Sequence, residues 1–217
     1  MKLGIALAAA FTVVVQGLSL SEFLPVPAAL ALAAVWAALI CAFALWLTRN
    51  GTRSAWTEDV LIGLGCTAMA LFAFGGAIGL LMWGIALDSA SITGEVMVGM
   101  FLPSIPIAIL ANVPTELVVI PVLLIVGWRP GARRVLIVLA AGLYFVLRVW
   151  TYLVFAGPRL DFAGAEHSTT RLTAAERAEF ADGLHIDDPR WIVNFAIFAV
   201  FLVAAFFSRV RDLPTRR

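Results

Sequence analysis

The amino-acid sequence predicts an all-α integral membrane protein, a six-transmembrane-helix bundle with no separate soluble domain. Of its 217 residues, 62% are hydrophobic and only 13% are charged. Soluble domains average about 45–50% apolar and about 25% charged residues. Apolar runs of about 20 residues, the length that a helix needs to cross a bilayer, recur along the chain. We therefore expect residues 1–217 to form a single transmembrane domain whose constant partner is the lipid bilayer.

The first predicted span covers residues 3–20 and follows the basic start Met1-Lys2. A secretory signal peptide has a similar layout, but this apolar run is long for a signal core and no clear Ala-x-Ala site follows it. We expect a retained span, with Gln16 deep within it.

The second and third spans are predicted over residues 25–48 and 60–87. Pro25 suits a helix start, where its missing N–H would be unpaired in any case. In the third span, Gly75 and Gly79 form a G-x-x-x-G pair, which often marks a face where helices pack closely. We expect this face to pack against another helix of the same chain or, failing that, to form a homo- or hetero-oligomer contact.

The fourth span, residues 100–126, combines four prolines with an amide, Asn112, and a carboxylate, Glu116. A proline inside a helix removes one backbone hydrogen bond and clashes with the preceding turn. We therefore expect this helix to be kinked or broken near Pro114. Glu116 would then lie in the first turn of a new helical segment, whose dipole favours a carboxylate.

The fifth and sixth spans are predicted over residues 134–156 and 191–208. Residues 157–190 between them form the only long polar stretch, and we expect an extracytoplasmic loop there. A capping box of sequence T-A-A-E opens a short predicted surface helix over about residues 174–182.

The positive charges indicate the orientation of the chain. With six spans, ten lysines and arginines fall on the side of the two termini and four on the other, while Arg148 lies within a span. The positive-inside rule then places the N and C termini in the cytoplasm, in a cytoplasmic (inner) membrane. Because the cytoplasmic arginines flank spans, where they set topology and meet anionic lipid, we expect no nucleic-acid partner.

Four strongly polar side chains lie at similar predicted depths. A rise of 1.5 Å per residue puts them about 16–22 Å from the cytoplasmic ends of their spans, near the midplane. They are Gln16, Asn112, Glu116 and Arg148. Asn112 and Glu116 are four residues apart, so they share a face if the turn between them is helical.

Tyr144, Arg148 and Tyr152 share a face of the fifth span in the same way. The fourth and fifth spans are joined by a short loop, which favours antiparallel neighbours. Arg148 should then reach Glu116, because an unpaired guanidinium at this depth is costly.

This buried pair leaves three functions open. The first is binding or transport of an anionic or amphipathic small molecule, with Glu116, Arg148, Asn112, Gln16, Tyr144 and Tyr152 as candidate ligand-binding residues. The second is an intramembrane enzyme, such as an oxidoreductase or lipid-modifying protein, that uses a tyrosine or the carboxylate. The third is an accessory subunit in which the pair only locks two helices together. The sequence identifies neither catalytic residues nor a cofactor.

No metal site is expected. His167 and His185 lie in the outer loop without the three or four convergent ligands that a metal requires. Cys41 and Cys66 lie in apolar runs and lack a metal-ligand spacing. Neither a P-loop nor a Rossmann fingerprint occurs in the sequence.

Overall fold

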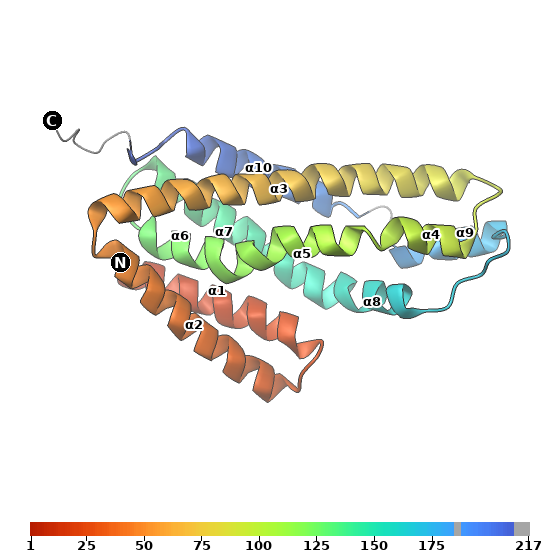
Figure 1. The fold of residues 1–217 in the computed structure, drawn as a ribbon, viewed down its shortest axis with the longest axis horizontal. Helices are drawn as coiled ribbons and strands as arrows, with labels where there is room; N and C mark the ends of the chain where they lie inside the picture. The colour runs from red at the N-terminus through yellow and green to blue at the C-terminus, as the bar shows by residue number, and fades with distance from the viewer. Residues whose placement is uncertain (185–187, 211–217) are drawn as a thin grey trace.

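A computed structural model describes residues 1–184 and 188–210, and Figure 1 shows that they form a bundle of helices. The α-helices are α1 (Lys2–Ser21), α2 (Val26–Thr48), α3 (Gly51–Asp88), α4 (Gly94–Phe101), α5 (Ser104–Pro114), α6 (Ile120–Val126), α7 (Ala132–Trp150), α8 (Ala156–Gly164), α9 (Ala174–Leu184) and α10 (Arg190–Ala205). Two π-helical segments, η1 (Thr115–Val119) and η2 (Thr151–Phe155), join α5 to α6 and α7 to α8. Within these ranges, β-pairing is limited to one isolated bridge, between Thr93 and Arg171.

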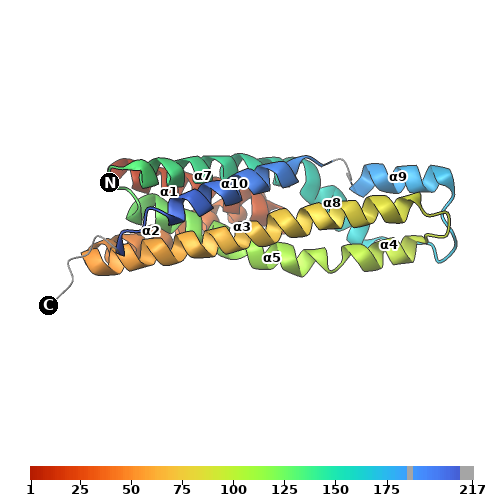
Figure 2. The ribbon, with the colours of Figure 1, turned by 90° about the horizontal axis from the view of Figure 1, so that it is seen from above.

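The helices run roughly along one axis (Figures 1 and 2). The hairpin of α1 and α2 packs on α6, while α3 packs along α10, which also contacts α7. Figure 2 shows the start of α1 and the end of α10 at one end of the bundle and α9 at the other. One large apolar core fills the half of the bundle near the termini. A smaller core at the other end is formed by Trp83 of α3 with Met97 and Phe101 of α4, and side chains of α8 and α9 pack against it.

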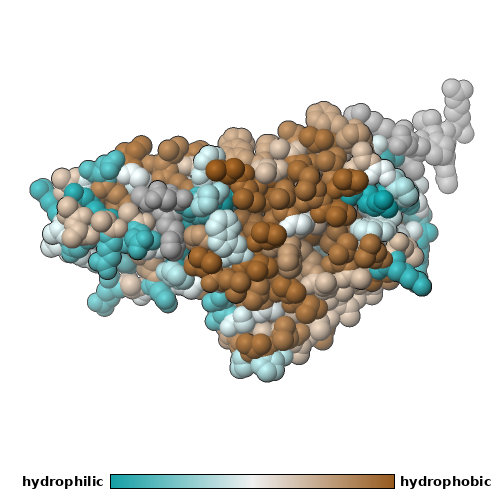
Figure 3. Space-filling model, turned by 180° about the vertical axis from the view of Figure 1, so that it is seen from behind, coloured by the Kyte–Doolittle hydropathy of each residue, from teal (hydrophilic) through white to brown (hydrophobic). Residues whose placement is uncertain are grey.

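Five helical stretches of the described chain are long and apolar enough to cross a membrane. They are Lys2–Ser21, Val26–Thr48, Gly51–Asp88, Gly94–Val126 and Ala132–Gly164. The apolar helix α10 has 16 residues, fewer than the roughly 20 that a span usually needs. Figure 3 shows apolar side chains over the middle of the molecule and hydrophilic ones gathered at the end opposite the termini. The fold thus agrees with the predicted all-α membrane class, while the count of six spans stays a prediction.

The fourth predicted span differs from expectation in where it is interrupted. A break separates α4 from α5 at Leu102 and Pro103, where the sequence offered a span start near Pro103 as the alternative to a kink at Pro114. At Pro114 the helix continues, and the irregularity is the π-helical segment η1 immediately after it. The third helix likewise begins at Gly51, nine residues before the predicted residue 60, because the Asn50 side chain caps it by accepting from Arg53 N at 3.0 Å.

At the end of the bundle near the termini, ionic contacts join α3 to α7 and to the segment that follows α10. Arg133 of α7 contacts Glu58 at 3.2 Å and also pairs with Asp59, both on α3. Arg209, after α10, contacts the other oxygen of Glu58 at 2.7 Å. The Glu58 side chain is fully buried, so these cations supply the compensation that a charge without water requires.

The short helix predicted over about residues 174–182 is present as α9, while its position outside the cytoplasm stays a prediction. Its capping box forms as expected, because Thr173 N donates to Glu176 Oε2 at 2.6 Å and Glu176 N donates to Thr173 Oγ1 at 3.3 Å. The backbone N–H and the hydroxyl of Thr173 together hold the pKa of the Glu176 carboxyl below its usual 4.5.

The capping box predicts a pH-dependent start of α9. A carboxyl whose pKa is lowered by folding stabilises the fold above its ordinary pKa, and that stabilisation is lost as the pH falls through the lowered value. We expect the first turn of α9 to lose hydrogen-exchange protection, corrected for intrinsic rates, as the pH falls below 4.5. Glu176→Gln should remove this pH dependence, and Glu179→Gln on the same exposed helix should keep it. An unchanged pH profile in Glu176→Gln would contradict the assignment.

Candidate functional site

A buried ion pair joins η1 to α7. The Arg148 Nε contacts Glu116 Oε1, and the two residues are only 7% and 3% exposed. The contact predicted from sequence is therefore present. Because each charge lies away from water, each depends on the other for compensation.

The other four predicted residues gather around this pair. Arg148 Nη2 donates to the Tyr152 hydroxyl at 2.6 Å, and that hydroxyl donates to Glu116 Oε2 at 3.0 Å. Gln16 Nε2 donates to the same carboxylate oxygen at 3.4 Å. The Tyr144 hydroxyl donates to Asn112 Oδ1 at 3.0 Å and lies 3.4 Å from Glu116 Oε1. Side chains from α1, α5, η1, α7 and η2 thus form one polar cluster, although their role in binding stays a prediction.

Both π-helical segments begin with a threonine, and both contribute to the cluster. At η1, Thr115 N donates to Asn112 O, three residues back. The Thr115 hydroxyl donates to Ala111 O at 2.6 Å. At η2, the Thr151 hydroxyl likewise donates to Leu147 O at 2.7 Å. Single π-helical turns within α-helices often occur at functional sites, because they re-aim side chains. The Tyr152–Glu116 hydrogen bond joins the two segments directly.

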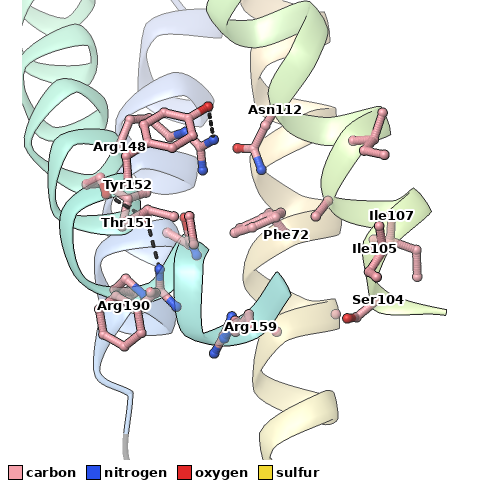
Figure 4. Close-up of a pocket in the computed structure, with 18 of the residues that line it drawn as sticks. Phe72, Ser104, Ile105, Ile107, Asn112, Arg148, Thr151, Tyr152, Arg159 and Arg190 are labelled. Atoms are coloured by element: carbon pink, nitrogen blue, oxygen red, sulfur yellow. Dashed lines mark hydrogen bonds between the residues drawn. The ribbon is translucent and has the colours of Figure 1, made fainter. Parts of the chain in front are cut away.

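A cavity of about 540 Å³ opens beside the cluster. Its walls come from α3, α5, η1, the α7–α8 helix, the start of α10 and the end of α1. In Figure 4, Arg148 and Asn112 point toward one another at one end of this cavity, while Arg159 and Arg190 lie at the other end. Most of the lining between the ends is apolar and includes Phe72, Ile105 and Ile107.

A second polar group lies at the far end. Arg190 Nε and Nη2 donate to Asp188 Oδ2 at 2.8 and 2.5 Å, and its Nη1 donates to Thr151 Oγ1 at 2.9 Å. Arg159 Nη2 also donates to Asp188 Oδ2, at 3.3 Å. Burial raises the pKa of the Asp188 carboxyl, but the hydrogen bonds and charge of Arg190, with Arg159, outweigh it and hold that pKa below its usual value. Sequence analysis had assigned these residues only to the outer loop.

Asn194 is the site residue that sequence analysis missed. It lies on α10 four residues after Arg190, lines the cavity and is only 3% exposed. Within the described residues, its side-chain oxygen Oδ1 has no hydrogen-bond partner. Buried polar atoms are nearly always satisfied, so an unsatisfied one beside a cavity calls for a further partner. The available sequence signal was a single amide within the sixth apolar run.

The glycine pair of α3 does not pack as predicted. A Cβ atom built at Gly75 or Gly79 would meet no heavy atom of another element within 4 Å. Both glycines, together with Gly76, line the cavity. The expected close packing within the chain is therefore wrong, because the neighbouring α5 stands away from α3 across the cavity. An oligomer contact through this face stays a prediction.

The chemistry of the site is that of hydrogen bonding around a neutralised charge pair. Among residues 1–184 and 188–210, no group of three histidine, cysteine or acidic side chains could hold a metal ion. His167 Nε2 lies 2.8 Å from Phe162 O, and His185 lies outside the described residues. Both carboxylate oxygens of Glu116 already have partners. Asn112 adds a side-chain N–H₂ to the cavity wall.

The ion pair predicts a non-additive effect on stability. Arg148→Leu leaves the Glu116 carboxylate buried without its cation, which typically costs about 3–5 kcal/mol. Arg148→Leu combined with Glu116→Leu removes both charges and should recover most of that loss. The measurement is the thermal unfolding midpoint of the detergent-solubilised protein, with Arg49→Leu as an exposed-arginine control. Equal losses in the single and the double variant would contradict the pairing.

No protein-family model, curated protein or solved structure matches the chain. The site must therefore be interpreted from its own side chains and cavity.

Proposed function

We propose that this chain is a multi-pass membrane protein that binds an amphipathic small molecule in the cavity beside Glu116 and Arg148. The polar group of the ligand would meet Arg148, Asn112 and Asn194. Its apolar body would lie against α3 and α5. Transport of the same molecule is the activity that such a binding site would serve in a membrane.

The observation that carries the proposal is a cavity of suitable size with the polar side chains of Arg148, Asn112 and Asn194 on its wall. Small-molecule sites typically enclose roughly 300–1,000 Å³ and combine apolar walls with a few convergent polar groups. This cavity, of about 540 Å³, has that composition.

Arg148 supports the same interpretation. Its Nε contacts the Glu116 carboxylate and its Nη2 donates to the Tyr152 hydroxyl. Its Nη1 makes no hydrogen bond within the described residues. The Nη1 amino group and the Asn112 amide come from facing walls of the cavity (Figure 4). A ligand oxygen between them would accept from both, whereas the Glu116 carboxylate keeps the net charge of the pair at zero.

The two alternatives fit less well. An accessory subunit with a purely structural pair would have a filled interior, because protein cores are packed with few voids larger than a water molecule. An intramembrane enzyme would need an acid or base poised toward a reactant, but Glu116 is already engaged by Arg148, Tyr152 and Gln16. Binding requires no change in these bonds, so it is the function that the geometry favours.

The proposed arrangement in the membrane has six crossings, with both termini in the cytoplasm of an inner membrane. The five long apolar stretches and α10 would supply these crossings, with α10 completing its span through flanking residues. The start of α1 and the end of α10 lie at the same end of the bundle, as an even number of crossings requires (Figure 2). The ion pair would then lie near the midplane, and the cavity would extend from it toward the side of α8 and α9.

Extraction of the purified protein tests the proposal. We expect wild-type protein, purified in mild detergent and extracted with organic solvent, to release one enriched compound that mass spectrometry detects. Asn194→Leu and Asn112→Leu should each release about tenfold less, because each loses a buried hydrogen bond to the ligand.

The control is Thr67→Val, a polar-to-apolar change on an exposed face of α3 outside the cavity. It should release as much compound as wild type. Equal amounts from all four proteins, or no enriched compound from wild type, would contradict the proposed function.

A further inference from the structure

We propose that the ligand is a single-chain membrane lipid with a carboxyl or hydroxyl head group, which enters the cavity sideways from the bilayer between α3 and α5. This inference rests on the proposed binding function and adds the class of ligand and its route. Three features carry it: a wall without side chains, apolar flanks, and a polar end that presents hydrogen-bond donors.

The wall without side chains is the glycine face of α3. Gly75, Gly76 and Gly79 line the cavity, are exposed or half-buried, and have open space where a Cβ would stand. Phe72 and Trp83 lie on the same lining, and they bound a stretch of roughly 16 Å at 1.5 Å per residue. This wall therefore offers an elongated apolar trough rather than a compact pocket.

The flanks of the trough are suited to lipid contact. On α3, Leu71 lines the cavity and is 43% exposed. On α5, Ile109 and Val113 are 54% and 44% exposed. Large apolar side chains exposed on both sides of an opening favour a hydrocarbon environment over water. A molecule that approaches through this opening would come from the acyl-chain region of the bilayer.

The opposite end of the cavity is less accessible. The ion-paired residues Arg159, Asp188 and Arg190 connect α8 to the start of α10 there. Asp188 and Arg190 are only 7% and 6% exposed, and Arg190 is also bonded to Thr151. A water-borne solute would have to pass this network, whereas a lipid would avoid it.

The polar end selects the head group. Arg148 Nη1 makes no hydrogen bond within the described residues, and the Asn112 side chain lies on the facing wall (Figure 4). Arg148 and Asn112 supply donors and need an acceptor. A carboxylate or hydroxyl oxygen accepts hydrogen bonds, so one such head group can satisfy both donors. A cavity of about 540 Å³ is of drug-molecule size, which favours one hydrocarbon chain over the two of a phospholipid.

Photo-crosslinking tests this inference. The full-length protein is reconstituted into phosphatidylcholine vesicles that contain a long-chain fatty acid bearing a diazirine and an alkyne, with the matching fatty alcohol as a second probe. After irradiation, adducts are located by mass spectrometry. We expect adducts from at least one probe to concentrate on the stretches of α3 and α5 that line the cavity, above the level found on the exposed face of α2.

A pair of glycine variants on α3 locates the route. Gly79→Phe places a ring inside the trough and should lower cavity adducts at least about tenfold, because the ring and the chain compete for one volume. Gly63→Phe is the matched control, since Gly63 is exposed on the same helix, has open space at its Cβ and does not line the cavity. It should leave the adducts unchanged. Thermal midpoints confirm that both variants are folded.

Two outcomes would overturn the inference: adducts no denser in the cavity than on α2, or cavity adducts that persist in folded Gly79→Phe. Failure of the proposed function is distinguishable from these. If extraction still yields a compound that depends on Asn112 and Asn194 while both probes leave the cavity unlabelled, the site binds a ligand of another class. If neither experiment yields a dependent compound or adduct, the binding function itself is wrong.

Discussion

The structure depends on the cost of placing Glu116 and Arg148 within a lipid bilayer. A charged side chain near the centre of a membrane helix costs roughly 2.5–3.5 kcal/mol on insertion scales, several times the roughly 0.5–1.5 kcal/mol of an ordinary hydrogen bond. Direct contact between the two charges reduces this cost, and Tyr152 and Gln16 complete the remaining bonds of the carboxylate. The helices that supply these residues must therefore meet at this depth, which fixes α1, η1 and α7 relative to one another.

The two π-helical segments show how the chain meets this requirement locally. In each segment the first threonine donates its hydroxyl to a backbone carbonyl of the preceding turn, Ala111 O from Thr115 and Leu147 O from Thr151. Leu147 O also accepts from Thr151 N, so it does not depend on the hydroxyl alone. Such bonds matter in hydrocarbon, where an unsatisfied backbone group costs several kcal/mol. Local hydrogen bonds thus stabilise the irregular turns. The hydrogen bond between Tyr152 and Glu116 then joins the two segments within the polar cluster.

The sequence predicted the membrane class and the central contact because both follow from strong free-energy terms. A carboxylate and an arginine in adjacent apolar runs have few ways to avoid each other in lipid. The π-helical turns were not predicted, because threonine and proline in a helix are compatible with several backbone responses. The glycine face of α3 was misinterpreted for a similar reason. Small residues permit close packing, but they equally permit a cavity, and only the position of α5 decides between the two.

Each π-helical turn accommodates one more residue than an α-helical turn would. Removing a single residue from η1 and restoring an α-helix would rotate everything on one side of it by about 100° relative to the other. Glu116 or Asn112 would then leave the cluster, although every side chain of the site would still be encoded. The site is thus specified by residue spacing as well as by residue identity. A related chain that kept the acidic, basic and amide residues but lacked that inserted position would form an ordinary bundle without this polar centre.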